Sequence, residues 1–100
     1  MPEMEFEWDW SKELENIRKH QVGFTEAVEC FFDPNGFALK DERHSAAEPR
    51  FYWIGKTSSG KILTTRFTRR GSRIRIIGSA EWREFRRLYN EKTRHKKSTS

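Results

Sequence analysis

Residues 50–78 read RFYWIGKTSSGKILTTRFTRRGSRIRIIG, and this stretch decides the fold. It holds three runs rich in β-branched and aromatic residues, Arg50–Lys56, Lys61–Thr68 and Arg73–Gly78. The two gaps between them are short and contain glycine, as β-hairpin turns do. The stretch therefore predicts an antiparallel β-meander.

The second hairpin also predicts which side chains share a face of the sheet. A two-residue turn at Arg70-Gly71 would place Phe67 opposite Ile74 and Arg66 opposite Arg75. One face would then be core and carry Tyr52, Ile54, Leu63, Phe67, Ile74 and Ile76. The other would mix arginines with threonines and aromatic rings: Phe51, Trp53, Thr64, Arg66, Thr68, Arg73 and Arg75.

This arginine face would place like charges opposite one another. Such a pair destabilises a sheet, so Arg66 against Arg75 needs an anion or a carboxylate between them. A phosphate group of a ligand would meet that need. A glutamate from a covering helix or loop would meet it equally, and a hydrated face is a third alternative.

The segments before the meander predict a strand and two helices. Met4 to Asp9 alternates apolar and acidic residues, which is typical of a strand. From Ser11 to about His20 the apolar residues recur at helical spacing, with Asp9 or Ser11 as the N-cap. We expect Thr25 to cap a second short helix, which ends at Asp33-Pro34-Asn35-Gly36. The apolar face of that helix would be Ala27, Val28, Phe31 and Phe32.

The remaining segments complete a single α+β domain over residues 1–92. Phe37 to Leu39 is a candidate short strand, and residues 40–49 are expected to form an exposed loop. Residues 81–92 predict an amphipathic helix whose apolar side includes Trp82 and Tyr89. Residues 93–100 are polar and basic, so we expect a disordered tail.

Charge is divided unevenly between the two halves of the chain. Residues 1–50 hold 6 basic and 12 acidic side chains, whereas residues 51–100 hold 14 basic and 3 acidic ones. A basic half of this strength indicates a polyanion or an acidic protein as partner, and a merely hydrated basic surface is the alternative.

Three classes of protein are disfavoured by the sequence. Cys30 is the single cysteine, so we expect a buried thiol without a disulfide. Metal-dependent hydrolases are disfavoured because neither an HExxH motif nor a Cys/His ligand spacing is present. No apolar run reaches the roughly 20 residues that span a bilayer, and the amino terminus is acidic rather than basic. We therefore expect a cytoplasmic protein that uses no metal or other cofactor and does not bind a membrane.

Several spaced elements, taken in order, resemble the BrnT toxins of bacterial type II toxin–antitoxin systems. The amino-terminal elements are Phe6-Glu7-Trp8-Asp9, Lys12, Asn16, Lys19-His20, Val22, Phe24, Glu26-Ala27 and Phe31-Phe32-Asp33. The later elements are Asp41-x-Arg43-His44-Ser45, Arg50, Ile54-Gly55, Arg73-Ile74-Arg75-Ile76-Ile77 and Tyr89. Many relatives place an arginine after a Ser-Ala pair, and here Arg83 follows such a pair two residues later than in those relatives.

The resemblance implies a RelE-like fold and a metal-independent endoribonuclease that stops growth by cutting RNA. It also implies a cognate antitoxin that resembles BrnA, binds DNA and forms a heterotetramer with the toxin. The catalytic candidates are Arg66, Arg73 and Arg75 for charge stabilisation, and His20, His44 and Tyr89 for proton transfer. The candidate RNA-binding residues are Lys12, Lys19, Arg43, Arg50, Trp53 and Arg83.

Each proton-transfer candidate also has a structural interpretation. His20 stands at a helix end, where its charge would complement the helix dipole. His44 stands in an exposed loop, and Tyr89 has the spacing of a core residue. Two other functions stay open: a nucleic-acid-binding module without catalysis, and a surface that serves mainly to dock the antitoxin.

Overall fold

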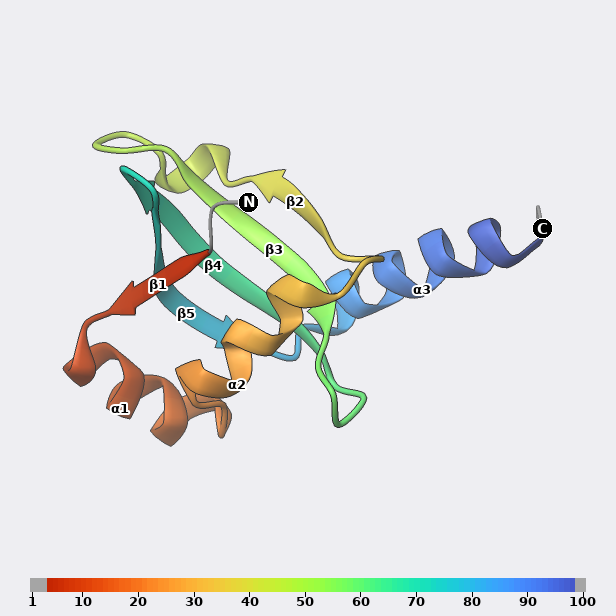
Figure 1. Ribbon diagram of the computed structural model, residues 1–100, viewed down its shortest axis with the longest axis horizontal. Coiled ribbons are helices and arrows are strands. Elements are labelled where there is room, and N and C mark those ends of the chain that lie inside the picture. Colours follow the sequence, from red (N-terminus) through yellow and green to blue (C-terminus); the bar gives the residue numbers. More distant parts are fainter. Residues whose placement is uncertain (1–3, 99–100) are drawn as a thin grey trace.

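Five strands form one mixed sheet in the order β1-β5-β4-β3-β2 (Figure 1). The computed structural model describes the backbone of residues 4–98 and the side chains of residues 4–94. The strands are β1 (Glu5–Trp8), β2 (Phe37–Lys40), β3 (Arg50–Lys56), β4 (Ile62–Arg70) and β5 (Arg73–Ala80). β1 runs parallel to β5, and the other neighbouring strands are antiparallel. The predicted meander and α+β class are confirmed.

Three α-helices and two 3-10 turns accompany the sheet. They are α1 (Trp10–His20), α2 (Phe24–Glu29), η1 (Cys30–Phe32), η2 (Glu42–His44) and α3 (Arg83–Ser98). The second half of α3 projects away from the sheet (Figure 1). This helix continues through residues 93–98, where we expected a disordered tail, because that segment contains neither Gly nor Pro. Residues 99–100 lie outside the described residues.

The helix starts are set by two carboxylates. The Asp9 side chain accepts a hydrogen bond of 2.8 Å from the Ser11 amide, as predicted for the start of α1. α2 begins two residues earlier than predicted, with Gly23 rather than Thr25 at its N-cap. The Phe24 amide donates instead to Glu13 Oε2 at 2.8 Å, so a side chain of α1 caps α2.

The register of the β4–β5 hairpin differs from the predicted one. Gly71 and Ser72 form the turn, so Thr68 rather than Arg66 lies opposite Arg75. Farther along, Phe67 pairs with Ile76 and Arg66 with Gly78, which leaves Ile77 as the extra residue of a β-bulge. The predicted juxtaposition of Arg66 and Arg75 is therefore wrong.

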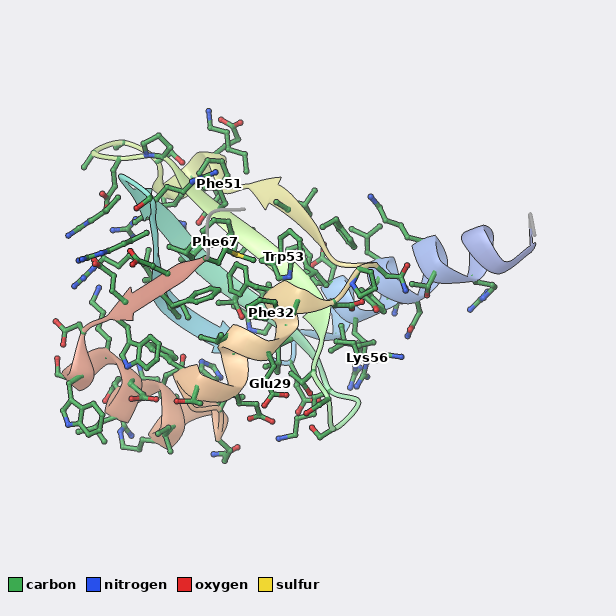
Figure 2. The ribbon with its side chains drawn as sticks, in the orientation of Figure 1. Glu29, Phe32, Phe51, Trp53, Lys56 and Phe67 are labelled. Carbon is green, nitrogen blue, oxygen red and sulfur yellow. The ribbon has the colours of Figure 1, made fainter. Side chains whose placement is uncertain are left out.

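The face assignment on β3 is also reversed. Lys56 pairs with Ile62, so the loop of residues 57–61 has an odd length and exchanges the two faces relative to an even-length turn. Phe51 lies opposite Phe67 with ring centroids 5.5 Å apart, and Trp53 lies on the same face (Figure 2). Tyr52 and Ile54 lie instead on the face that carries Arg66.

The two faces of the sheet are covered by different elements. α2 and η1 cover one face, where the core consists of Val22, Phe24, Ala27, Cys30, Phe31, Leu63, Phe67 and Ile76. α3 covers one end of the other face, above Ile54 and Ile62. Burial raises the pKa of the Cys30 thiol to about 12, so Cys30 is the buried, inert thiol that we expected.

α1 turns a polar side toward the protein. Glu13 and Asn16 are its buried residues, whereas Trp10, Leu14 and Ile17 are exposed, Trp10 to 69%. The apolar residues that reveal this helix by their spacing therefore face solvent. A groove lies between this helix and the face that carries Arg66.

Candidate functional site

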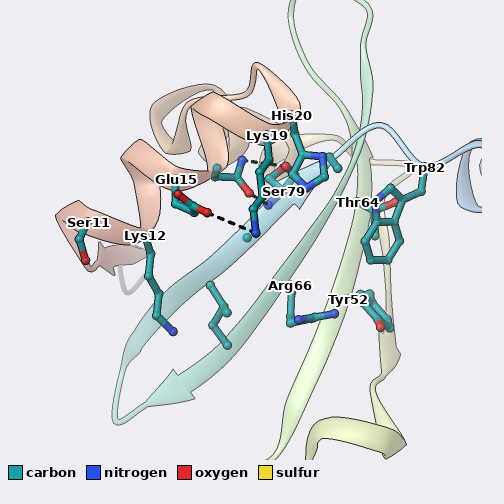
Figure 3. Close-up of a pocket in the computed structure, with 14 residues that line it drawn as sticks. Ser11, Lys12, Glu15, Lys19, His20, Tyr52, Thr64, Arg66, Ser79 and Trp82 are labelled. Carbon is teal, nitrogen blue, oxygen red and sulfur yellow. Dashed lines mark hydrogen bonds and ion pairs between the residues drawn. The ribbon is translucent and has the colours of Figure 1, made fainter.

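A groove of about 530 Å³ opens between α1 and the sheet face that carries Arg66 (Figure 3). One wall is α1, and the floor is formed by the last residues of β5. Tyr52, Arg66 and Trp82 line the opposite side. The full lining is Ser11, Lys12, Glu15, Asn16, Lys19, His20, Tyr52, Thr64, Arg66, Ile77, Gly78, Ser79, Ala80 and Trp82.

Three cationic or titratable side chains of α1 point toward this groove. Lys12 and Lys19 are two helical turns apart and share one side of the helix, and His20 follows directly. The Lys19 ammonium lies 3.3 Å from Glu15, which also binds Arg18 at 2.8 Å. The structure thus brings three of the predicted site residues to one wall.

Asn16 fixes α1 against the sheet. Its side-chain oxygen accepts from the Ser79 amide at 3.0 Å, and its nitrogen donates to the Ser79 carbonyl at 2.8 Å. The same nitrogen donates to the Val22 carbonyl at 2.9 Å. β1 pairs only with residues 73–76 of β5, so the Asn16 amide satisfies the backbone where that neighbouring strand is absent. This positioning residue was missed because its polarity alone suggests an exposed site.

Arg66 is the arginine of the sheet that lines the groove. Its guanidinium lies over the Tyr52 ring, 5.7 Å from the centroid. Its Nε lies 3.6 Å from Asp41 Oδ2, which is longer than a hydrogen bond. Among the described side chains, this Nε is the buried polar atom without a hydrogen-bond partner. The Arg66 side chain as a whole is 28% exposed and lines the groove, so it presents a permanent positive charge to an anion there.

Asp41 connects Arg66 to His44. The Asp41 carboxylate lies 3.0 and 3.2 Å from Nδ1 of His44, and Asp41 is only 3% exposed. Burial opposes ionisation of Asp41, but the hydrogen bond from His44 and the charges of His44 and Arg66 outweigh it, so the pKa of Asp41 lies below its usual range. An ionised carboxylate only accepts, so Nδ1 carries a proton toward Asp41, and in the neutral form of the imidazole Nε2 is then the acceptor.

The segment around Asp41 is more ordered than the exposed loop that we expected for residues 40–49. The Asp41 amide donates to the Arg50 carbonyl at 2.8 Å, and Ser45 Oγ donates to the Asp41 carbonyl at 2.6 Å. Arg43 is exposed in the same 3-10 turn as His44. Arg50 begins β3 opposite Thr68, on the same face as Arg66. This segment therefore holds His44 in a defined position against Asp41, although His44 is not among the residues that line the groove.

Arg73 and Arg75 share the face of Arg66 but are neutralised by β1. Arg75 binds Glu7 at 2.8 Å, and Arg73 lies 3.3 Å from Glu7 and 3.5 Å from Glu5. Hydrogen bonds from Arg75 and Arg73 lower the pKa of Glu7. We expected such a glutamate from a covering helix or loop, whereas the structure supplies it from β1, a neighbouring strand of the same sheet.

Three further candidates lie away from the groove. The Trp53 indole packs on the helix-covered face and donates to the Cys30 carbonyl at 2.5 Å, a close approach that is possible because position 55 is glycine. Tyr89 lies on the buried side of α3, packed against the sheet, and its hydroxyl donates to Asp33 at 2.5 Å. Arg83 lies beside Arg86 and Arg87 in the first turns of α3. Neither Trp53 nor Tyr89 occupies the site predicted for it.

Two findings bound the chemistry of the described part of the chain. Among the side chains that the structure describes, no three His, Cys, Asp or Glu residues lie close enough together to hold a metal ion. None of the helices within residues 4–98 is long and apolar enough to cross a membrane.

The protein is a small, basic α+β domain. Its groove is lined by lysines, an arginine, a histidine and aromatic rings. The family model of the ribonuclease toxin BrnT of type II toxin–antitoxin systems matches residues 8–84. The chain belongs to this family, so the resemblance seen in the sequence is confirmed. A toxin of this class has an antitoxin as its partner.

The fold is shared with a solved structure. The crystal structure of the Brucella abortus ribonuclease toxin BrnT, at 1.1 Å resolution, matches with a TM-score of 0.63 at 20% sequence identity. The match covers 80% of this chain and 97% of that one. Comparison with the curated proteins gives no match.

Proposed function

We propose that this toxin is a metal-independent endoribonuclease and that the groove beside α1 is its active site. The observation that carries the proposal is the contact series Arg66–Asp41–His44. It places a permanent cation and an oriented imidazole on either side of one buried carboxylate. Charge stabilisation and proton transfer are the two needs of RNA cleavage by the neighbouring 2′-hydroxyl.

His44 acts first in this proposal. Its Nε2 removes the proton of the ribose 2′-hydroxyl, while Asp41 holds Nδ1–H and stabilises the imidazolium that forms. The 2′-oxygen attacks phosphorus, and the bond from phosphorus to the 5′-oxygen breaks. Arg66 stabilises the phosphate oxygens as negative charge builds up. The leaving 5′-oxygen takes a proton, for which His20, which lines the groove with Arg66, is our candidate donor.

The lysines of α1 would hold the RNA backbone on either side of the cut. Lys12 and Lys19 lie on one side of the helix at the groove wall, where both can contact phosphates of one strand. Arg50 and Arg43 extend this basic surface toward His44, and their contribution would be affinity rather than chemistry. Such contacts act on all sequences alike and weaken as salt rises.

The test is cleavage of end-labelled RNA by purified protein in EDTA. We expect the wild type to produce new ends that carry a 2′,3′-cyclic phosphate. In Arg66→Ala and His44→Ala the cleavage rate should fall at least about 100-fold, the typical size of acid–base and electrostatic contributions to catalysis. Arg87→Ala is the matched control, because this exposed arginine lies on α3 away from the groove. Binding without new ends would instead support a nucleic-acid-binding module without catalysis.

We also propose that a BrnA-like, DNA-binding antitoxin covers the groove and forms a heterotetramer with the toxin in the cytoplasm. An acidic partner would neutralise the lysines and Arg66 that the RNA needs, so docking and inhibition would coincide. Expression of the toxin alone should stop growth, Arg66→Ala should not, and co-expression of an antitoxin encoded beside it should restore growth. Native mass spectrometry of the copurified complex tests the assembly.

A further inference from the structure

Trp82 stands at the edge of the groove although its position predicts a core residue of the last helix. It lines the groove with Tyr52 and keeps 37% of its surface exposed. Its ring packs against Phe85 at 5.7 Å between centroids with an interplanar angle of 29°. The remainder of the indole borders the hollow (Figure 3).

Trp82 is connected to the proposed catalytic groups through Tyr52. The rings of Trp82 and Tyr52 meet edge to face with centroids 5.7 Å apart. The other neighbours of Tyr52 are Phe85, at 5.2 Å between centroids, and the Arg66 guanidinium, at 5.7 Å from the ring centroid. Tyr52 is thus packed between other groups, whereas Trp82 still has exposed ring surface. Trp82 and Arg66, the arginine proposed to bind phosphate, therefore both contact Tyr52.

The floor next to Trp82 has room for a planar group. It is made by the short side chains of Thr64 and Ala80 and by the backbone of Gly78 and Ser79, because the Ser79 side chain points to the opposite face, where it hydrogen-bonds Thr65. Because none of these side chains projects far, the hollow extends from the indole to the α1 wall. Such a space, with an aromatic edge and cations around it, suits a nucleobase whose phosphate is held nearby.

We propose that Trp82 is a nucleobase-stacking subsite and that the substrate is consequently single-stranded RNA. This inference rests on the proposed function, since it assigns a substrate class to the same groove. In duplex RNA the base faces are stacked on one another, and proteins reach mainly phosphates and 2′-hydroxyls. An indole can pair with a base face only where that base is unstacked, as in loops, ends and single strands. Stacking tolerates every base, so this subsite selects strand form rather than sequence.

The experiment measures binding to a 2′-O-methyl oligonucleotide of about 12 nucleotides, a length within the usual site size for single strands. This probe lacks the 2′-hydroxyl nucleophile and stays uncut. The same strand annealed to its complement is the duplex probe. We expect the wild type to prefer the single strand by about tenfold, the size of one stacked base. Equal affinity for both probes would overturn the proposal without any variant.

Three variants separate stacking from packing. Trp82→Leu keeps an apolar side chain against Phe85 without an aromatic face, and should lose about tenfold in single-strand affinity with little change for the duplex. Trp82→Phe should restore most of that affinity. Trp10→Ala is the matched control, because Trp10 is exposed on α1 outside the groove lining. Melting temperatures report any loss of packing.

The outcomes distinguish this inference from the proposed function. An equal loss for single strand and duplex in Trp82→Leu, or no loss in either, would show that Trp82 serves packing alone. Cleavage by the wild type would leave the ribonuclease proposal standing in that case. Selective loss of single-strand binding in a protein that makes no new RNA ends would support the subsite and contradict the catalytic proposal.

Discussion

Asp41 Oδ2 lies 3.0 Å from Nδ1 of His44, and this carboxylate is almost completely buried. The pair orients the imidazole, so we expect Asp41→Asn to lower the cleavage rate by at least about 100-fold while RNA affinity changes little. The asparagine amide would donate to Nδ1 and place the imidazole proton on Nε2, the wrong tautomer for a base. Nitrogen NMR of His44 should show that change.

Glu42→Gln is the control for Asp41→Asn, because Glu42 is the next residue along the chain and an exposed carboxylate in the 3-10 turn that holds His44. It should keep the wild-type rate. Wild-type cleavage in Asp41→Asn would exclude a role for Asp41 in positioning His44. A loss of melting temperature that matches the loss of rate would point to folding instead.

Tyr89 should contribute stability that disappears at high pH. Burial, with the Asp33 carboxylate, raises the pKa of Tyr89 in the folded protein above the value of about 10 in the unfolded chain. The protonated phenol is thus favoured by folding, so its contribution is complete below about pH 10 and is lost as pH rises toward the folded pKa. Urea titrations of the wild type should show this alkaline loss.

Tyr89→Phe should remove most of that alkaline slope. At pH 7 it should cost about 1–3 kcal/mol, because Asp33 loses a buried donor. RNA cleavage per folded molecule should be unchanged, since Tyr89 lies outside the groove. A variant that folds normally but no longer cuts RNA would return Tyr89 to the list of catalytic groups.

Removal of the Asn16 amide should destabilise the whole fold. Asn16→Ala leaves the Ser79 amide, the Ser79 carbonyl and the Val22 carbonyl without their partner. We expect a loss of about 2–4 kcal/mol in the free energy of unfolding, measured by urea denaturation. Asn90→Ala, at an exposed position of α3, should change stability by less than about 0.5 kcal/mol. Similar values for both would refute the role assigned to Asn16.

Glu7 should restrain the arginines of β5. Glu7→Gln releases Arg73 and Arg75 from their ion pairs with Glu7, so RNA affinity should rise severalfold. The decrease of affinity with salt should also become steeper, by an amount that corresponds to about one further phosphate contact. Glu29→Gln is the control, because Glu29 binds Ser58 instead. Binding of the uncut oligonucleotide over a salt series measures the effect. Unchanged affinity would mean that these arginines do not reach RNA.

Local patterns were enough to predict the elements of this fold. Alternation along residues 50–78 and the glycine turns identified the meander, because strand periodicity and turn chemistry act between near neighbours. Residue type was enough to select Arg66, His20 and His44, because permanent charge and the capacity of an imidazole for proton transfer are properties of single residues. Lys12 and Lys19 were added by the resemblance to the BrnT family.

The tertiary structure alone decided which of these residues form one site. The odd length of the 57–61 loop exchanged Trp53 for Tyr52 on the arginine face, and the turn at Gly71-Ser72 placed Thr68 rather than Arg66 opposite Arg75. A one-residue change in register reverses every side chain of a strand, and no local propensity encodes it. Burial of Asp41 and Asn16 likewise depends on partners distant in sequence. The sequence by itself therefore determined the strands, the helices and the candidate chemistry, whereas long-range packing determined the groove.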